Sequence, residues 1–197
     1  MPITAAQVNE LRQLTGCGMM DCKRALEETG GDVDAAIRLL RERGIASAAK
    51  RAGRATGEGV IDTYVHAGGK IAAMVELNCE TDFVSRTDDF RNLAHELAMQ
   101  VAATNPQWVR REDVPAEVIE QEREILRQRA LHDGEPEAKI PRIVEGRLTK
   151  FFAETVLLEQ PYIRDPKRKV QDLVDDVRAR LGENIVVRRF VRWQLGE

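Results

Sequence analysis

The chain has 197 residues, of which 43% are hydrophobic and 32% charged, and its net charge is −3. This length suits one core domain with a small additional module, and the composition is ordinary for a globular protein. The slight acidity argues against a dedicated nucleic-acid binder, which usually carries a strongly basic domain. No apolar run approaches the ~20 residues that cross a bilayer, and no secretory pattern is visible, so a cytoplasmic protein without a membrane partner is expected.

The three helices expected in residues 3–44 form a compact N-terminal module. Thr4 and Gln7 have the spacing of a capping box at the start of the first helix. Asp32 caps the third helix, and Gly44 is expected to end it. Apolar residues at helical spacing give each helix an inward face: Val8, Leu11 and Leu14 in the first, Ala25 and Leu26 in the second, and Val33, Ala36, Ile37 and Leu40 in the third.

The stretch after this module, residues 45–59, is basic and rich in alanine and glycine. Such a composition predicts a linker, which is expected to be partly helical up to Arg51. The chain is therefore divided into an N-terminal module with its linker, residues 1–54, and a core, residues 55–197.

Two β-rich runs, 60–66 and 70–77, flank a Gly68–Gly69 turn. They predict an antiparallel hairpin, because paired glycines suit the positive φ angles of tight turns. The glycines lie between strands rather than before a helix, so they do not predict a phosphate loop. A last β run, 184–193, is expected to pair with the hairpin, since a lone strand cannot satisfy its backbone. Its arginines are interpreted as a solvated strand face, not as a nucleic-acid site.

Four further helices are expected between the hairpin and the last strand. Their apolar stripes are Phe90, Leu93, Ala94, Leu97, Ala98 and Val101; then Ile119, Leu126 and Ala130; then Ile140, Ile143, Val144, Leu148, Phe151, Phe152 and Thr155; and then Val170, Leu173, Val174 and Val177. The fourth of these helices is expected to begin at Asp165 and to end at Gly182. Helices, a hairpin, helices and a strand indicate an α+β fold, in which helices pack on a small antiparallel sheet.

The cysteines, Cys17, Cys22 and Cys79, are an odd and sparse set, which fits a reduced chain better than a disulfide framework. Their spacing does not suit a structural zinc site. Cys79 and His66 fall near the ends of paired strands, but Glu80 would raise the pKa of the thiol, which disfavours a nucleophile. Neither a metal nor a cofactor nor catalysis is therefore expected; metal analysis and thiol titration would test this alternative.

One aromatic residue, Phe83, lies in an acidic turn after the hairpin, in the stretch "ETDFVSRTDD". An aromatic residue at such a corner either folds inward as local core or points outward to contact another protein. The stretch "GCGMM" raises a similar question for Met19 and Met20. Methionines exposed in a loop suit adaptable protein contacts, and burial in the module is the alternative, above all for Met20.

Four segments, "TGCGMMDCKRALEETGGDVDAAIRLLRERG", "LNCETDFVSR", "LLEQPYI" and "GENIVVRRF", together closely resemble bacterial elongation factor Ts in its short form. The resemblance implies a guanine-nucleotide exchange factor for the GTPase elongation factor Tu, and not an enzyme with bond chemistry of its own. It also implies a three-helix module of the ubiquitin-associated kind, a linker and an α+β core. The residues implied to enter the GTPase and displace its Mg²⁺ are Thr81, Asp82, Phe83 and Val84; Met19 and Met20 are implied to contact its nucleotide-binding domain.

Two positions qualify this resemblance. Cys17 stands where members of that family commonly carry a small residue such as alanine, and it adds an oxidisable thiol near the expected interface. The short forms are implied to be homodimers joined through the core sheet. Val191, in the last strand, leaves no cysteine there for a covalent link, so packing would have to hold such a dimer. A plain peptide-binding module is the remaining alternative, but it leaves residues 55–197 without a role.

Overall fold

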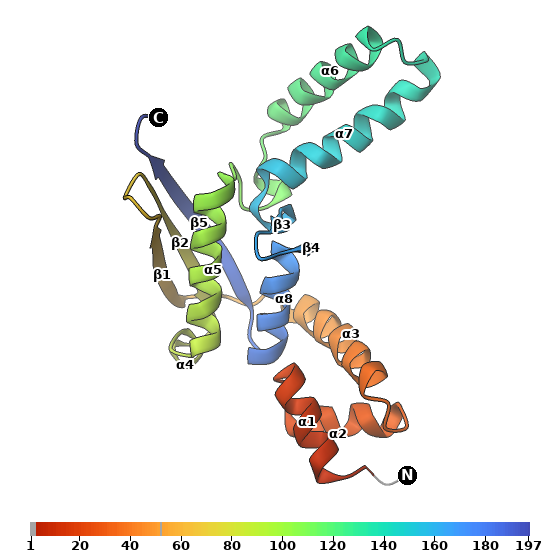
Figure 1. The fold of residues 1–197 in the computed structure, drawn as a ribbon, viewed down its shortest axis with the longest axis vertical. Helices are drawn as coiled ribbons and strands as arrows, with labels where there is room; N and C mark the ends of the chain where they lie inside the picture. The colour runs from red at the N-terminus through yellow and green to blue at the C-terminus, as the bar shows by residue number, and fades with distance from the viewer. Residues whose placement is uncertain (1–2, 52) are drawn as a thin grey trace. The chain divides into compact units, whose positions relative to one another are not determined.

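The computed structural model describes residues 3–51 and 53–197, and it confirms the predicted α+β class. Figure 1 shows the elements along the chain. The helices are α1 (Ala5–Thr15), α2 (Met19–Glu28), α3 (Val33–Arg51), α4 (Asp82–Ser85), α5 (Asp88–Thr104), α6 (Ala116–His132), α7 (Ile140–Thr155) and α8 (Val170–Leu181). The strands are β1 (Glu58–Val65), β2 (Ile71–Cys79), β3 (Pro161–Tyr162), β4 (Asp165–Lys169) and β5 (Ile185–Gln194).

The chain folds into two compact units that interleave in sequence. The first comprises Met1–Ile61, Glu76–Ala94 and Asp172–Val187, and the second comprises Asp62–Val75, His95–Gln171 and Arg188–Glu197. Strands β1, β2 and β5 and helices α5 and α8 therefore contribute residues to both units. The division of the chain into an N-terminal module with its linker, residues 1–54, and a core, residues 55–197, stays a prediction from the sequence. Ala52, within the predicted linker, lies outside the described residues.

Helices α1, α2 and α3 pack together as the predicted module. The capping box is confirmed: the N–H of Gln7 donates to Oγ1 of Thr4 at 3.3 Å, and the N–H of Thr4 donates to Oε1 of Gln7 at 3.0 Å. Leu14 is exposed, so its place in the buried stripe was wrong. At 3.6 residues per turn, Thr15 rather than Leu14 returns to the face of Val8. The buried set is Val8, Leu11, Cys22, Ala25, Leu26, Ala36 and Leu40.

Helix α3 does not end at Gly44 but continues to Arg51, so the helical part of the predicted linker is confirmed and the predicted stop was wrong. The start is as expected, because Oδ1 of Asp32 accepts a hydrogen bond of 2.9 Å from the N–H of Ala35. A Cβ atom at Gly44 would lie only 2.9 Å from Cβ of Ala179 in α8. The glycine therefore permits close approach of two helices and does not serve as a helix stop.

The main sheet has three strands in the order β1–β2–β5, so the predicted pairing of the last strand with the hairpin is confirmed. Gly68 and Gly69 turn the hairpin with φ angles of 90° and 67°, and the N–H of His66 donates to the carbonyl of Ile71 at 2.8 Å. The N–H of Leu195 donates to the carbonyl of Lys70 at 2.8 Å. The end of β5 therefore lies beside the start of β2, as in an antiparallel pair.

Helix α5 follows the predicted apolar stripe closely. All six of its predicted inward residues are buried: Phe90, Leu93, Ala94, Leu97, Ala98 and Val101. The helix ends at Thr104, and Asn105 takes a left-handed conformation with φ 48° immediately before Pro106. This ending follows from the proline, since the residue before a proline disfavours the helical conformation.

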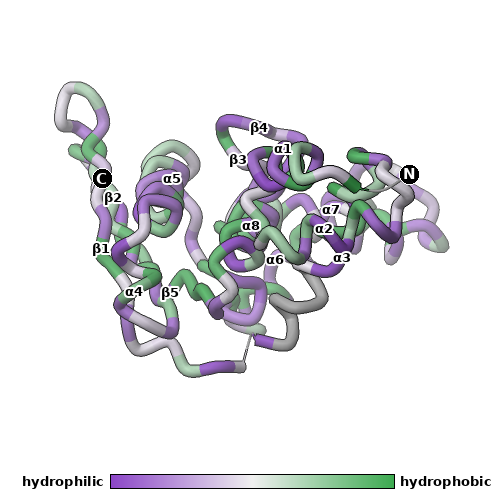
Figure 2. The backbone as a smooth tube through the Cα atoms, turned by 90° about the horizontal axis from the view of Figure 1, so that it is seen from below, coloured by the Kyte–Doolittle hydropathy of each residue, from purple (hydrophilic) through white to green (hydrophobic). Residues whose placement is uncertain are grey.

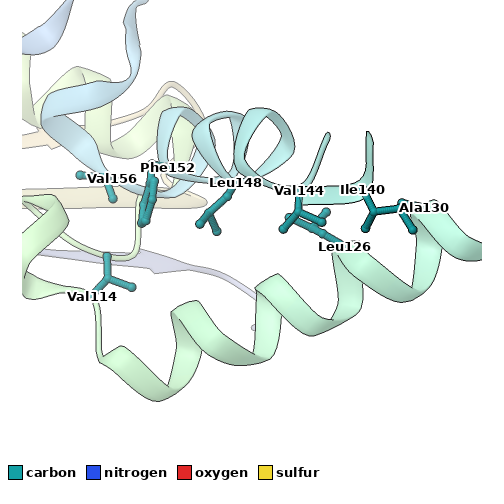
Figure 3. Close-up of a cluster of buried hydrophobic side chains, with 8 residues drawn as sticks. All are labelled: Val114, Leu126, Ala130, Ile140, Val144, Leu148, Phe152 and Val156. Carbon is teal, nitrogen blue, oxygen red and sulfur yellow. The ribbon is translucent and has the colours of Figure 1, made fainter. Parts of the chain in front are cut away.

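Helices α6 and α7 form an antiparallel hairpin, and Gly134 in the turn between them has a positive φ of 74°. Figure 3 shows the apolar side chains that meet between the two helices. The buried members are Val114, Leu126, Ala130, Ile140, Val144, Leu148, Phe152 and Val156; Ile119, Ile143 and Phe151 pack at the margin, half-buried. The two predicted stripes are therefore confirmed as one shared core.

A second, two-stranded sheet was missed from the sequence. Residues Asp165–Lys169, expected to be the first turn of a helix, form β4 and pair antiparallel with β3, with Pro161 opposite Lys169. Figure 2 shows β4 as a hydrophilic stretch, which offers no apolar stripe for a helix. The residue before Pro166 also disfavours helix. Helix α8 begins at Val170, where the apolar stripe begins, and Gly182 ends it as predicted, with φ 74°.

Candidate partner-binding site

The turn between β2 and α5 contains the short helix α4, which carries the acidic corner noted in the sequence. We call Thr81–Val84 the TDFV corner. Phe83 is 78% exposed, whereas its neighbours Val84 and Ser85 are buried. The interpretation of Phe83 as a local core residue was therefore wrong, and its ring points outward. Burial of the two residues that follow turns the ring away from the interior.

A single carboxylate, that of Glu183, holds the start of this corner. Its Oε2 accepts hydrogen bonds from the backbone N–H groups of Glu80 at 3.1 Å and Thr81 at 3.0 Å. Its Oε1 accepts a third, of 2.6 Å, from the hydroxyl of Thr81. Hydrogen bonds to a charged acceptor are stronger than those between neutral groups. The corner is thus anchored to the loop between α8 and β5.

The carbonyl of Thr81 is held from the other side. It accepts hydrogen bonds from the thiol of Cys79 at 3.1 Å and from the N–H of Ser85 at 3.3 Å. Burial, and next the nearby charge of Glu183, raise the pKa of Cys79 from its usual 9.0 to about 11. The expected direction of this shift is confirmed, although burial and Glu183 cause it rather than Glu80. The thiol therefore stays protonated near neutral pH and acts as a donor, not as a nucleophile.

A reciprocal set of contacts runs from the corner back to the same loop. Oε1 of Glu80 accepts a hydrogen bond of 2.7 Å from the N–H of Asn184, and Oε2 of Glu80 lies 3.4 Å from Nη1 of Arg54. The side-chain amide of Asn184, which is buried, donates to the carbonyl of Arg54 at 2.9 Å. Each segment therefore offers a carboxylate to backbone N–H groups of the other.

The far side of the corner is fixed by local hydrogen bonds. The carboxylate of Asp82 pairs with Arg86 at 2.7 Å. The backbone carbonyl of Asp82 accepts a hydrogen bond of 2.9 Å from the hydroxyl of Ser85. Thr87 is the residue before α5. Its hydroxyl donates to the carbonyl of Val84 at 2.8 Å and accepts a hydrogen bond of 3.3 Å from the N–H of Phe90 in the first turn of α5. The polar groups are thus engaged within the chain, and the ring that projects is apolar.

The two methionines of the module are also exposed. Met19 is 52% and Met20 is 63% exposed at the first turn of α2, so burial of Met20 in the module was the wrong alternative. Behind them, Cys22 is buried and its sulfur lies 3.8 Å from the hydroxyl of Thr15. Cys17, in the loop before α2, is half-buried. The module thus presents flexible apolar side chains beside a well-packed interior.

The sequence interpretation missed Glu183, Asn184 and Arg54 as parts of this site. Glu183 lies 102 residues beyond Thr81, and no local pattern of residue types connects the two. The sequence predicts a strand from residue 184 but gives no signal for the role of Glu183 just before it. Any residue type can supply the backbone group in a contact between a side chain and the backbone. The residue types therefore do not indicate such a contact, and the structure is needed to find it.

In residues 3–51 and 53–197, no three or more His, Cys, Asp or Glu side chains gather closely enough to hold a metal ion. None of the helices in the described part of the chain is both long and apolar enough to span a bilayer.

Comparison with known proteins gives a consistent result over nearly the whole chain. Residues 7–197 match the family model described as "Elongation factor TS". Elongation factor Ts of Carboxydothermus hydrogenoformans is 58% identical over 195 residues, which cover 99% of this chain and 90% of that protein. Elongation factor Ts of Thermoanaerobacter sp. is 57% identical, with coverage of 99% and 96%. Elongation factor Ts of Herpetosiphon aurantiacus is 57% identical over 196 residues, with coverage of 100% and 99%.

Proposed function

Because this chain belongs to the elongation factor Ts family of translation factors, we propose that it binds elongation factor Tu in its GDP form and accelerates the release of GDP. Release of GDP then allows GTP to bind. The chain makes and breaks no covalent bond in this role, and its place of action is the cytoplasm. Its effect is to change the stability of a complex on another protein.

The free energy required for such an exchange is set by the GTPase. A GTPase holds its nucleotide through a phosphate loop and through Mg²⁺, which bridges phosphate oxygens to protein side chains. Nanomolar affinity corresponds to about 12 kcal/mol. An exchange factor does not need to supply all of this free energy. It needs to stabilise a distorted form of the GTPase in which several of those contacts are already lost.

The observation that carries the proposal is an apolar ring, 78% exposed, on a corner tied to the chain on both sides. Burial of Phe83 between helices of the partner would contribute about 1.5–3 kcal/mol. This gain exists only in the opened form of the partner, so it shifts the equilibrium toward nucleotide release. Because the corner is already ordered, little of the gain is lost to ordering on binding.

The other corner residues have supporting roles in this proposal. The carboxylate of Asp82, which is 44% exposed, would disturb the hydrogen bonds around the bound Mg²⁺ of the partner. Thr81, anchored by Glu183, and Val84, which is buried, hold the turn in place. Met19 and Met20 would contact the nucleotide-binding domain, because methionine side chains adapt to irregular apolar surfaces.

Coupling between the two ligands of the partner is reciprocal. If the factor weakens GDP binding by some ratio, GDP weakens binding of the factor by the same ratio. Incoming nucleotide therefore displaces the factor, and one molecule of factor can serve many molecules of the GTPase.

Stopped-flow release of a fluorescent GDP analogue from elongation factor Tu tests this proposal. The parent chain is compared with Phe83→Ala and Asp82→Ala, each with and without excess Mg²⁺. Ile125→Ala is the matched control, since Ile125 is also an exposed apolar residue but lies on α6. We expect fast release with the parent and with Ile125→Ala, and about 10- to 100-fold slower release with Phe83→Ala, as the loss of 1.5–3 kcal/mol implies.

Three other outcomes of this assay would each be informative. Fast release that neither substitution affects would keep the exchange function but move its mechanism to the N-terminal module, where Met19 and Met20 would be substituted next. No acceleration by the folded parent would overturn the exchange function for this chain. A larger effect of Mg²⁺ on Asp82→Ala than on Phe83→Ala would support separate roles for the carboxylate and the ring.

We also propose that two copies associate through the core sheet. Val65 at the end of β1 and Trp193 near the end of β5 are exposed on strands, and burial of such side chains is favourable. Sedimentation velocity of the parent, of Trp193→Lys and of the control Ile125→Lys would test this. We expect the parent and the control Ile125→Lys to be dimers and Trp193→Lys to be a monomer. A parent that is monomeric at micromolar concentration would contradict the proposal.

A further inference from the structure

We propose that Glu183 is the positioning residue of the TDFV corner: its carboxylate holds Thr81 so that Phe83 reaches the partner already in place. The inference rests on the exchange function proposed above and names a side chain, outside the corner itself, on which that function depends. The observation behind it is the set of three hydrogen bonds that one carboxylate accepts from Glu80 and Thr81.

Glu183 is itself held firmly, which a positioning residue must be. It follows Gly182, where α8 ends, and precedes Asn184, whose N–H is bound by Glu80 at 2.7 Å. The guanidinium of Arg178 donates to the carbonyl of Ile185, so the loop is closed on its other side as well. The carboxylate therefore has a defined position before any partner binds.

The corner needs such an anchor because α4 is too short to be stable alone. It has four residues, and a single helical turn fixes several backbone angles for very few hydrogen bonds. Thr81 is the residue that precedes this turn, with an extended backbone at φ −130° and ψ 155°. Its orientation sets the direction of α4, and Phe83 is the second residue of α4. Release of Thr81 would let the exposed ring sample many directions, and ordering it again would oppose binding.

This role predicts a specific kinetic effect. Because Phe83 is buried only in the opened complex, a loosened corner lowers the rate of GDP release at saturating factor. A general loss of folded protein has a different effect, since it lowers the active concentration. It would raise the amount of factor needed for half-saturation and leave the saturating rate unchanged.

The test compares Glu183→Ala and Glu183→Gln in the GDP-release assay over a range of factor concentrations. We expect Glu183→Ala to lower the saturating rate about tenfold, because the loosened corner must then lose conformational entropy each time it binds the partner. Glu183→Gln should restore most of the rate, since its amide oxygen can accept from the two N–H groups and its NH₂ group can donate to the hydroxyl of Thr81.

A double substitution tests whether Glu183 acts through Phe83. Glu183→Ala combined with Phe83→Ala should release GDP no more slowly than Phe83→Ala alone, because a missing ring no longer needs to be positioned. If the two losses multiply instead, Glu183 acts on something other than Phe83 and the inference is overturned.

Amide hydrogen exchange on the free protein gives a readout that does not involve the GTPase. In Glu183→Ala, exchange at the N–H groups of Glu80 and Thr81 should be at least about tenfold faster than in the parent, since both groups lose their acceptor. The N–H of Leu97, within the buried stripe of α5, serves as the internal control and should not change.

The outcomes separate the inference from the exchange function. If Phe83→Ala slows release but Glu183→Ala changes neither the saturating rate nor the amide exchange, the inference is wrong and the exchange function stands. If the parent does not accelerate release at all, the exchange function fails, and the role of Glu183 in it fails too. Faster amide exchange with an unchanged saturating rate would show that Glu183 orders the corner without serving exchange, which also overturns the inference.

Discussion

The guanidinium of Arg178 in α8 donates two hydrogen bonds to the carbonyl oxygen of Ile185 at the start of β5, and the one from Nε is 3.2 Å long. The same guanidinium pairs with Asp175 at 2.7 Å. Burial lowers the pKa of Arg178, and the charge of Asp175 opposes this shift. One side chain thus closes the loop that carries Glu183.

Arg178→Ala is expected to lower the free energy of unfolding by about 2–4 kcal/mol, because a largely buried ion pair and two hydrogen bonds from a charged donor are lost together. Urea unfolding at neutral pH measures the change. Arg127→Ala is the control, since Arg127 and its partner Glu124 are both exposed, and such a pair contributes about 0–1 kcal/mol. Equal losses in the two variants would contradict the role given to Arg178.

Two phenylalanines in neighbouring helices should separate function from stability. Phe83→Ala removes an exposed ring, so the free energy of unfolding should change by less than about 0.5 kcal/mol. Phe90→Ala removes a fully buried ring and should cost about 3–5 kcal/mol. Denaturant titration of both variants provides the comparison. A large loss of stability in Phe83→Ala would mean that its effect on exchange cannot be assigned to the contact with the partner.

The raised pKa of Cys79 predicts a dependence of stability on alkaline pH. In the unfolded chain this thiol ionises near its usual pKa of 9.0, while in the folded chain it stays protonated up to about 11. The folded state therefore binds more protons between these values, and its contribution to stability is complete below pH 9 and is lost as the pH rises toward 11. Unfolding free energies of the parent and of Cys79→Ala, measured from pH 8 to 11, should converge as the pH rises. A difference that stays constant would contradict the assigned pKa.

Gly44 offers a test of the close approach of α3 and α8. Alanine is a better helix former than glycine by about 1 kcal/mol, so helix propensity alone predicts that Gly44→Ala stabilises the chain. The added Cβ would lie 2.9 Å from Cβ of Ala179, however, and we expect a net loss of about 1–2 kcal/mol. A double-mutant cycle with Ala179→Gly, followed by thermal unfolding, should show favourable coupling between the two substitutions. Simple additivity would show that the helices do not meet at these residues.

Periodicity predicted the helices well where one face is buried. The stripe of α5 is correct at every position, and the stripes of α6 and α7 form a common core. It failed where the pattern ended or was incomplete. Leu14 lies at the edge of its stripe, so a small rotation exposes it. Gly44 was interpreted as a helix stop, because the sequence does not show that Ala179 lies opposite. The strand β4 was missed because its five residues are four charged residues and a proline, which show neither the helical nor the strand period of apolar residues.

The candidate site was likewise predicted in part from the sequence and missed in part. The exposed residues, Phe83, Met19 and Met20, were singled out because apolar residues are unusual in polar or glycine-rich turns. The residues that hold them were not found, because Glu183 bonds mainly to backbone groups, and any residue type provides a backbone N–H. Sequence patterns report which side chains are buried or exposed. They do not report which distant backbone a carboxylate will bind.

The long separation between Thr81 and Glu183 has a consequence for how the protein is made. A ribosome adds residues from the N-terminus, so Thr81 emerges well before its anchor, which is added 102 residues later. Closing a loop of this length is entropically costly and follows the formation of local helices. The TDFV corner therefore cannot take its anchored shape until Glu183 has emerged. An incomplete chain that ends before residue 183 lacks the anchored corner, even where its helices have formed.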